Sequence, residues 1–167
     1  MSQTEIEKKY IVPSLKALPF DLTKFPSEAI YQGFYSGLPS PLRIRKVGEV
    51  YNLTKKFVVN ASKNHLEEVT IPIKKQEFSK LFPVAHKKIV KTRFEIKWNK
   101  YTIELDIFKG KLNGLVIAEI EFKNIQDMEK FKKPDFLGEE ITTKKWATNS
   151  RLALQTYAGI KKQLNKL

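Results

Sequence analysis

Cysteine is absent from the 167-residue chain, and histidine occurs only as His65 and His86. Without cysteine the chain can form no disulfide, thiolate nucleophile or cysteine zinc site. Two histidines leave little material for a histidine-based metal site or catalytic triad. The chemistry of any site therefore has to come from carboxylates, lysine and arginine.

Long apolar runs are missing as well. No segment approaches the ~18 consecutive apolar residues of a membrane helix, and the first twelve residues carry charges where a signal peptide would be apolar. We therefore expect a cytoplasmic protein. Acidic residues are outnumbered, with 31 Lys and Arg against 18 Asp and Glu and a net charge of +13. This charge favours an anionic partner and leaves nucleic acid, an acidic membrane surface and polyphosphate compounds open.

The hydrophobic pattern has a period of two along most of the chain, which predicts strands. We expect about eight of them, at residues 5–12, 29–35, 42–46, 50–60, 67–73, 88–98, 101–108 and 115–123. Short helices are expected at 74–82, ended by Pro83, and at 127–131, with a longer one at 149–164. The length fits one domain, so the sequence predicts a single antiparallel α+β domain over residues 1–167.

Charged residues on the predicted strands are sorted by sign. Residues two apart point to the same side of a strand. Five pairs of like-charged residues have this spacing. Any single pair would fit a solvated sheet face with weak cross-strand interactions. Acids are depleted from strands, however, and clustered acids favour hard cations, whereas clustered bases favour phosphate oxygens. Together these pairs predict a site for a metal-bound polyphosphate: Glu5 and Glu7, Glu104 and Asp106, Glu119 and Glu121, Arg43 and Arg45, and Lys91 and Arg93.

An ordered series of motifs covers about residues 5 to 153. It comprises Glu5-Ile6-Glu7-Lys8-Lys9, Gln32-Gly33, Arg43-Ile44-Arg45, Leu53-Thr54-Lys55-Lys56, Lys91-Thr92-Arg93, Glu104-Leu105-Asp106, the stretch 114–121, and Asn149-Ser150. In order and spacing this series resembles the CYTH domain, also called the triphosphate tunnel metalloenzyme superfamily. The first motif matches the family's ExExK signature.

The resemblance implies an antiparallel eight-stranded β-barrel forming a charged tunnel, with helices packed outside, as a monomer or homodimer. It also implies binding of nucleoside, thiamine or inorganic triphosphates together with Mg²⁺ or Mn²⁺. The bases that match the family's phosphate-binding residues are Lys9, Arg43, Arg45, Lys56, Lys91 and Arg93. The carboxylates that match its metal ligands are Glu5, Glu7, Glu119 and Glu121, and further tunnel acids are Glu68, Glu104 and Asp106.

The leading hypothesis is a metal-dependent triphosphatase that hydrolyses inorganic triphosphate or an organic triphosphate. Either Glu68 or Lys91 would accept the proton from the attacking water. A class IV adenylate cyclase of the same family, which converts ATP to cyclic AMP and pyrophosphate, is the alternative.

A third hypothesis, from a different class, is a basic nucleic-acid-binding barrel. The paired carboxylates oppose it, because they would repel a phosphate backbone in the same groove. The expected partner is therefore a small triphosphate-containing molecule rather than nucleic acid or a membrane. His65 and Leu66 stand where the family often has an arginine shortly before the acid aligned with Glu68. This departure leaves the substrate preference open.

Overall fold

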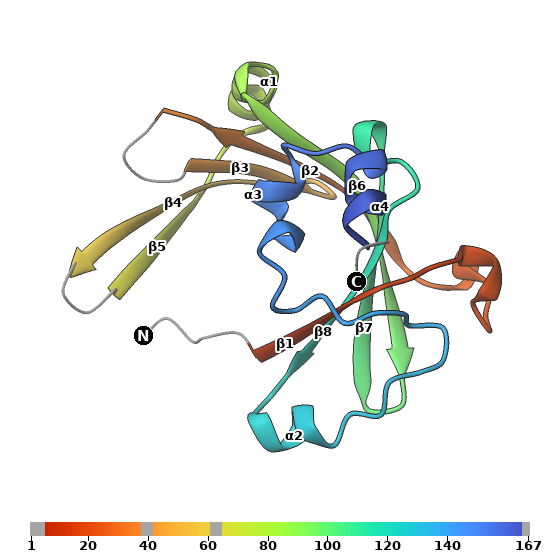
Figure 1. Cartoon of the computed structure of the whole chain (residues 1–167). Coiled ribbons are helices and arrows are strands. Elements are labelled where there is room, and N and C mark those ends of the chain that lie inside the picture. Colours follow the sequence, from red (N-terminus) through yellow and green to blue (C-terminus); the bar gives the residue numbers. More distant parts are fainter. Residues whose placement is uncertain (1–5, 38–41, 61–64, 165–167) are drawn as a thin grey trace. The chain divides into compact units, whose positions relative to one another are not determined.

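The computed structural model describes residues 6–37, 42–60 and 65–164, with side chains described except at 56–60 and 65–67. Eight strands are hydrogen-bonded in the order β1-β8-β7-β6-β2-β3-β4-β5 (Figure 1). They are β1 (Ile6–Ile11), β2 (Ser27–Tyr35), β3 (Leu42–Val47), β4 (Val50–Asn60), β5 (His65–Pro72), β6 (Lys87–Trp98), β7 (Tyr101–Phe108) and β8 (Val116–Phe122). The α-helices are α1 (Lys75–Val84), α2 (Ile125–Glu129), α3 (Asn149–Leu152) and α4 (Tyr157–Leu164). The predicted α+β class with eight antiparallel strands is confirmed.

Within its described ranges the chain divides into two compact units, one within residues 29–90 and one formed by residues 6–28 with 91–164. Each is described by itself below. Within the described ranges, no helix is both long and apolar enough to cross a membrane.

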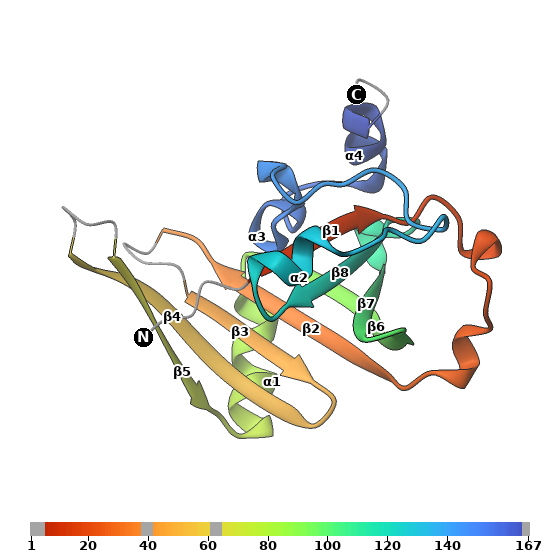
Figure 2. The same cartoon turned by 90° about the horizontal axis from the view of Figure 1, so that it is seen from below.

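The unit of residues 29–90 contains β2 to β5 and α1, and α1 crosses its strands (Figure 2). Ile44 of β3, Tyr51 of β4 and Phe78 of α1 form its buried apolar cluster. Gly33 of β2 allows this close packing, because a Cβ there would lie 2.7 Å from the Cβ of Ala85. One face of these strands is thereby covered, and the alternating residues point to the other.

The second unit contains β1, β8, β7 and β6 from Lys91 onward, joined by antiparallel ladders. Its apolar cluster includes Tyr10, Leu105 and Ile120 from the strands and Phe131 and Phe136 from the segment that follows α2. Because side chains alternate along a strand, this packing leaves the charged residues of the four strands on the opposite face.

The outer edge of β1 is occupied by the segment 138–142. The backbone N–H of Gly138 donates to Ile11 O at 2.7 Å, Ile11 N–H donates to Glu139 O at 2.9 Å, and Ile141 N–H donates to Lys9 O at 2.8 Å. These bonds use donors and acceptors that an edge strand would otherwise present for pairing. Among the described strands, β1 and β5 end the hydrogen-bonded order, so the predicted barrel is not closed by a ladder between them.

The helical boundaries differ from the prediction in three places. The segment 149–164 is two helices, because the Thr156 hydroxyl accepts from Gly159 N–H at 3.2 Å and caps a new helix, α4. Helix α2 begins two residues earlier than predicted, where the Asn124 side chain accepts from Asp127 N–H at 2.8 Å. Pro83 lies within α1, which ends at Val84.

Candidate functional site

The strand register of the second unit places the predicted charged residues on one face. Lys9 of β1 is opposite Glu119 of β8, and Glu119 is opposite Glu104 of β7. Arg93 of β6 is opposite Asp106 of β7. Residues directly opposite in a ladder point to the same side, so four strands contribute to one charged surface.

Arg93 is the centre of this surface. Its Nε donates to Asp106 Oδ1 at 2.7 Å, and its second terminal nitrogen donates to Asp106 Oδ2 and Glu119 Oε2, both at 2.7 Å. The other terminal nitrogen pairs with Glu104. Lys9 Nζ lies 2.9 Å from Glu119 Oε1 and 3.1 Å from Glu7 Oε1. Glu119 therefore bridges a lysine and an arginine, in charge-assisted bonds of the kind that fix side-chain geometry.

Lys91 and Asp106 form a fully buried ion pair, each side chain being 1% exposed. The Lys91 ammonium also lies 5.4 Å from the centre of the Phe108 ring. Burial lowers the pKa of Lys91, and the nearby charge of Arg93 adds to this, against the opposing effect of Asp106. Lys91 is thus held closer to its neutral form than an ordinary lysine.

The carboxylates of this surface differ in pKa. Burial alone would raise the pKa of Glu119, but Lys91, Lys9 and Arg93 outweigh it and lower that pKa to about 2. Burial raises the pKa of Glu104, and the neighbouring Glu119, Asp106 and Glu121 raise it further, against the opposing effect of Arg93. A cation bound near Glu104 would favour its ionised form.

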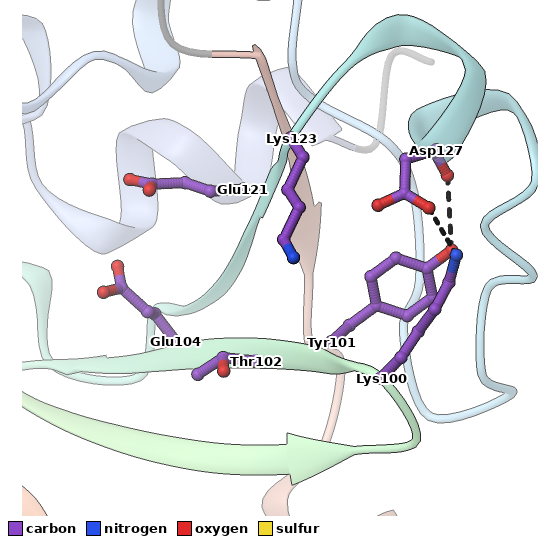
Figure 3. A pocket seen from close by; sticks show the side chains of 7 residues that line it. All are labelled: Lys100, Tyr101, Thr102, Glu104, Glu121, Lys123 and Asp127. Carbon is purple, nitrogen blue, oxygen red and sulfur yellow. Dashed lines mark hydrogen bonds and ion pairs between the residues drawn. The ribbon is translucent and has the colours of Figure 1, made fainter.

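A pocket of about 260 Å³ opens beside these acids (Figure 3). The side chains of Glu104 and Glu121 form one end of it, and Lys100 pairs with Asp127 at the other. It is lined by Lys100, Tyr101, Thr102, Glu104, Glu121, Lys123 and Asp127. Of these pocket residues, the sequence indicated only the two glutamates as site residues. Lys100 could have been found from the two-residue hairpin turn at 99–100, where Asn99 has φ 54°.

The other predicted residues belong to the unit of residues 29–90. Arg43 and Arg45 share one face of β3, and an Arg43 terminal nitrogen lies 3.4 Å from Glu68 Oε1 and 3.3 Å from Thr54 Oγ1. Thr54, which is buried, also hydrogen-bonds to Thr70 at 2.9 Å. The backbone of Lys56 is opposite Glu68, and the Lys56 side chain lies outside the description. The structure thus brings Arg43 and Glu68 together.

The predicted metal ligands are only partly described. Glu5 lies outside the described residues. Glu7 and Glu121 are opposite one another across β1 and β8, and Glu119 is on the same face. Within the described part of the chain, no three acidic or histidine side chains are arranged closely enough to hold a metal ion. The assignment of Glu5, Glu7, Glu119 and Glu121 as metal ligands stays a prediction.

Comparison with known proteins decides the family. No family model matches the chain. It is 32% identical over 158 residues to an inorganic triphosphatase of Nitrosomonas europaea, covering 90% of this chain and 97% of that protein. It is 30% identical over 160 residues to an inorganic triphosphatase of Acetivibrio thermocellus, covering 94% and 97%.

The chain belongs to the triphosphate tunnel metalloenzyme, or CYTH, superfamily. A crystal structure of an inorganic triphosphatase agrees, with a TM-score of 0.73, 30% identity, and coverage of 92% of this chain and 96% of that one. The predicted resemblance is confirmed. A second solved structure is a Hippeastrum protein described as an adenylyl cyclase candidate with a dominant triphosphatase activity. It has a TM-score of 0.52 at 19% identity over 75% of this chain and 83% of that one, and so shares the fold.

Proposed function

We propose that this protein is a triphosphatase that hydrolyses inorganic triphosphate to pyrophosphate and orthophosphate. One observation carries the proposal: Lys9, Lys91 and Arg93 converge with carboxylates on one face of β1, β8, β7 and β6. The names of the two curated relatives, which align over 97% of their own lengths, support inorganic triphosphate as the substrate.

The basic residues bind and orient the phosphates. Arg93 already donates to three carboxylates, so its planar donor group is held in place before substrate arrives. Phosphate oxygens accept hydrogen bonds from the remaining N–H donors of Arg93 and Lys9, whose positive charges neutralise the phosphates. Within the unit of residues 29–90, we assign phosphate binding to Arg43, Arg45 and Lys56. Such fixed positive charges favour a transition state in which charge spreads over the transferred phosphoryl oxygens.

Lys91 is the favoured proton acceptor. A general base must be neutral at the working pH, and burial lowers the pKa of Lys91 toward that condition. In the proposed reaction, water attacks the terminal phosphorus, its proton passes to Lys91 Nζ, and the bond to the bridging oxygen breaks. Glu68 is the less favoured choice, because its carboxylate pairs with Arg43 and its side chain is 36% exposed.

The donor chemistry of the acidic residues fits a divalent cation. Carboxylate oxygens are the ligands that Mg²⁺ and Mn²⁺ favour, and Glu119, Asp106 and Glu121 act on Glu104 as neighbouring negative charges. Glu7, Glu119 and Glu121, together with Glu5, would hold the ion. When bound, it would neutralise phosphate charge and lower the pKa of the attacking water.

Product analysis tests the proposal. The protein is incubated with tripolyphosphate, thiamine triphosphate or ATP, with Mg²⁺ or Mn²⁺, and orthophosphate, pyrophosphate and cyclic AMP are separated. We expect orthophosphate release, fastest from tripolyphosphate, and its loss when EDTA is added. Arg93→Ala should abolish turnover, whereas Lys16→Ala, which removes an exposed lysine on the 3₁₀ turn Leu15–Ala17, should retain it. Cyclic AMP and pyrophosphate from ATP would instead establish the cyclase.

A further inference from the structure

Gln32 carries a buried amide that the site described above does not use. It lies in β2, and the residue is only 2% exposed. Among the residues that the structure describes, its Oε1 finds no hydrogen-bond partner. A buried amide end without a partner is unfavourable for folding, and such groups in native proteins generally have a separate cause.

The strand register places this amide on the arginine face of its unit. Gln32 is directly opposite Arg45, and Phe34, two residues further on, is opposite Arg43. The alternate residues of β2 turn the other way, toward α1: the Tyr31 ring packs edge-on against Phe82 at 6.0 Å. Gln32 therefore points to the side on which the two arginines present their guanidinium groups.

The chemistry of the amide suits a phosphate ligand. Rotation about the last side-chain bond exchanges the amide oxygen and nitrogen, so the end without a partner can present two N–H donors. A neutral donor beside two guanidinium groups adds a directional hydrogen bond to an oxyanion. A carboxylate at this position would repel the anion, and an aliphatic side chain would offer it nothing.

We infer that Gln32 is a substrate-contacting residue whose side-chain amide donates a hydrogen bond to a phosphate oxygen held by Arg43 and Arg45. This inference rests on the proposed triphosphatase function. It explains why an amide stands where packing alone favours an apolar residue of similar volume. In the free protein the amide weakens folding, and the bound anion supplies the missing partner.

Two apolar substitutions of similar volume, Gln32→Leu and Gln32→Met, test the inference. Each variant's melting temperature is measured without ligand and over a tripolyphosphate titration, and KM and kcat are measured with Mg²⁺. Ile30→Val is the matched control, because Ile30 is fully buried two residues earlier on the same face of β2. The control should melt slightly lower and keep the wild-type KM.

We expect both Gln32 variants to melt at or above the wild-type temperature without ligand. Their KM and half-saturating tripolyphosphate concentration should rise at least about 10-fold, as for one lost hydrogen bond to a charged group. A KM and half-saturation within about twofold of wild type would overturn the inference. So would unfolding of both variants, since that result would make the amide a structural requirement. If the wild-type protein itself neither hydrolyses nor binds tripolyphosphate, the proposed function fails first and Gln32 falls with it.

Discussion

Replacing Asp106 with asparagine removes the buried counter-charge of Lys91 while keeping a side chain of the same shape. Asp106 accepts from Lys91 and from two nitrogens of Arg93, and both Lys91 and Asp106 are 1% exposed. Arg93 keeps its contacts with Glu104 and Glu119. Within the described ranges, Asp106 is the carboxylate that the Lys91 ammonium contacts, so the charged form of Lys91 becomes unfavourable in the variant.

The cost of this change is limited by loss of the Lys91 proton. Lysine in the unfolded chain has a pKa of 10.5, and each pH unit below that value costs about 1.36 kcal/mol when the folded state holds it neutral. The cost of holding Lys91 neutral is therefore at most about 4.8 kcal/mol at pH 7 and about 2 kcal/mol at pH 9. The sign follows from a lowered lysine pKa: stability is lost at low pH and regained as pH rises.

Urea unfolding of Asp106→Asn at pH 7, 8 and 9 measures this effect. We expect the unfolding free energy of the variant to rise by up to about 1.4 kcal/mol per pH unit, with the wild-type protein beginning its rise at higher pH. The double variant Asp106→Asn with Lys91→Met should regain most of the lost stability at pH 7, because position 91 no longer carries a titratable group without its counter-charge. A pH-independent loss that Lys91→Met does not rescue would refute the reasoning.

Three further predictions concern catalysis, acid stability and backbone geometry. Arg93→Lys should lower kcat/KM at least about 100-fold, because lysine lacks the planar donor set that contacts three carboxylates. Steady-state kinetics measure this loss, with Lys16→Ala as the control. Wild-type turnover of Arg93→Lys would contradict the prediction. The pKa of Glu119 is lowered to about 2, which contributes at most about 3 kcal/mol to the unfolding free energy above pH 4.5, and this contribution is lost as pH falls toward 2. Acid unfolding of Glu119→Gln should lack this pH-dependent loss. An unchanged acid transition would argue against the bridge to Lys9 and Arg93. Gly114→Ala should destabilise the fold by about 2 kcal/mol or more, because φ is +101° and a Cβ would lie 2.6 Å from the Tyr157 ring. Gly110→Ala, at φ +63° with open space around it, should cost about 1 kcal/mol. Equal melting temperatures for the two variants would exclude the Tyr157 clash.

The sequence by itself determined the strands, the sorting of charges onto one face and the family. Period-two alternation is a local property, and it places Arg93 two residues after Lys91 and Asp106 two residues after Glu104 on a common side of each strand. Ordered motifs along nearly the whole chain indicated the family that the relatives then established. Helix boundaries were less certain, because a single side-chain cap, such as Thr156, decides where one helix ends and another begins.

Only the tertiary structure decided which charges meet. Register across ladders made Glu119 the bridge between Lys9 and Arg93 and buried Asp106 with Lys91, and neither pairing follows from spacing within one strand. Burial raises the pKa of both Glu119 and Glu104, and only the contact of Glu119 with several basic groups lowers its pKa, although the two residues are directly opposite each other. The segment 138–142 occupies the outer edge of β1 through contacts about 130 residues apart in sequence. Such contacts depend on long-range packing, which local periodicity does not encode.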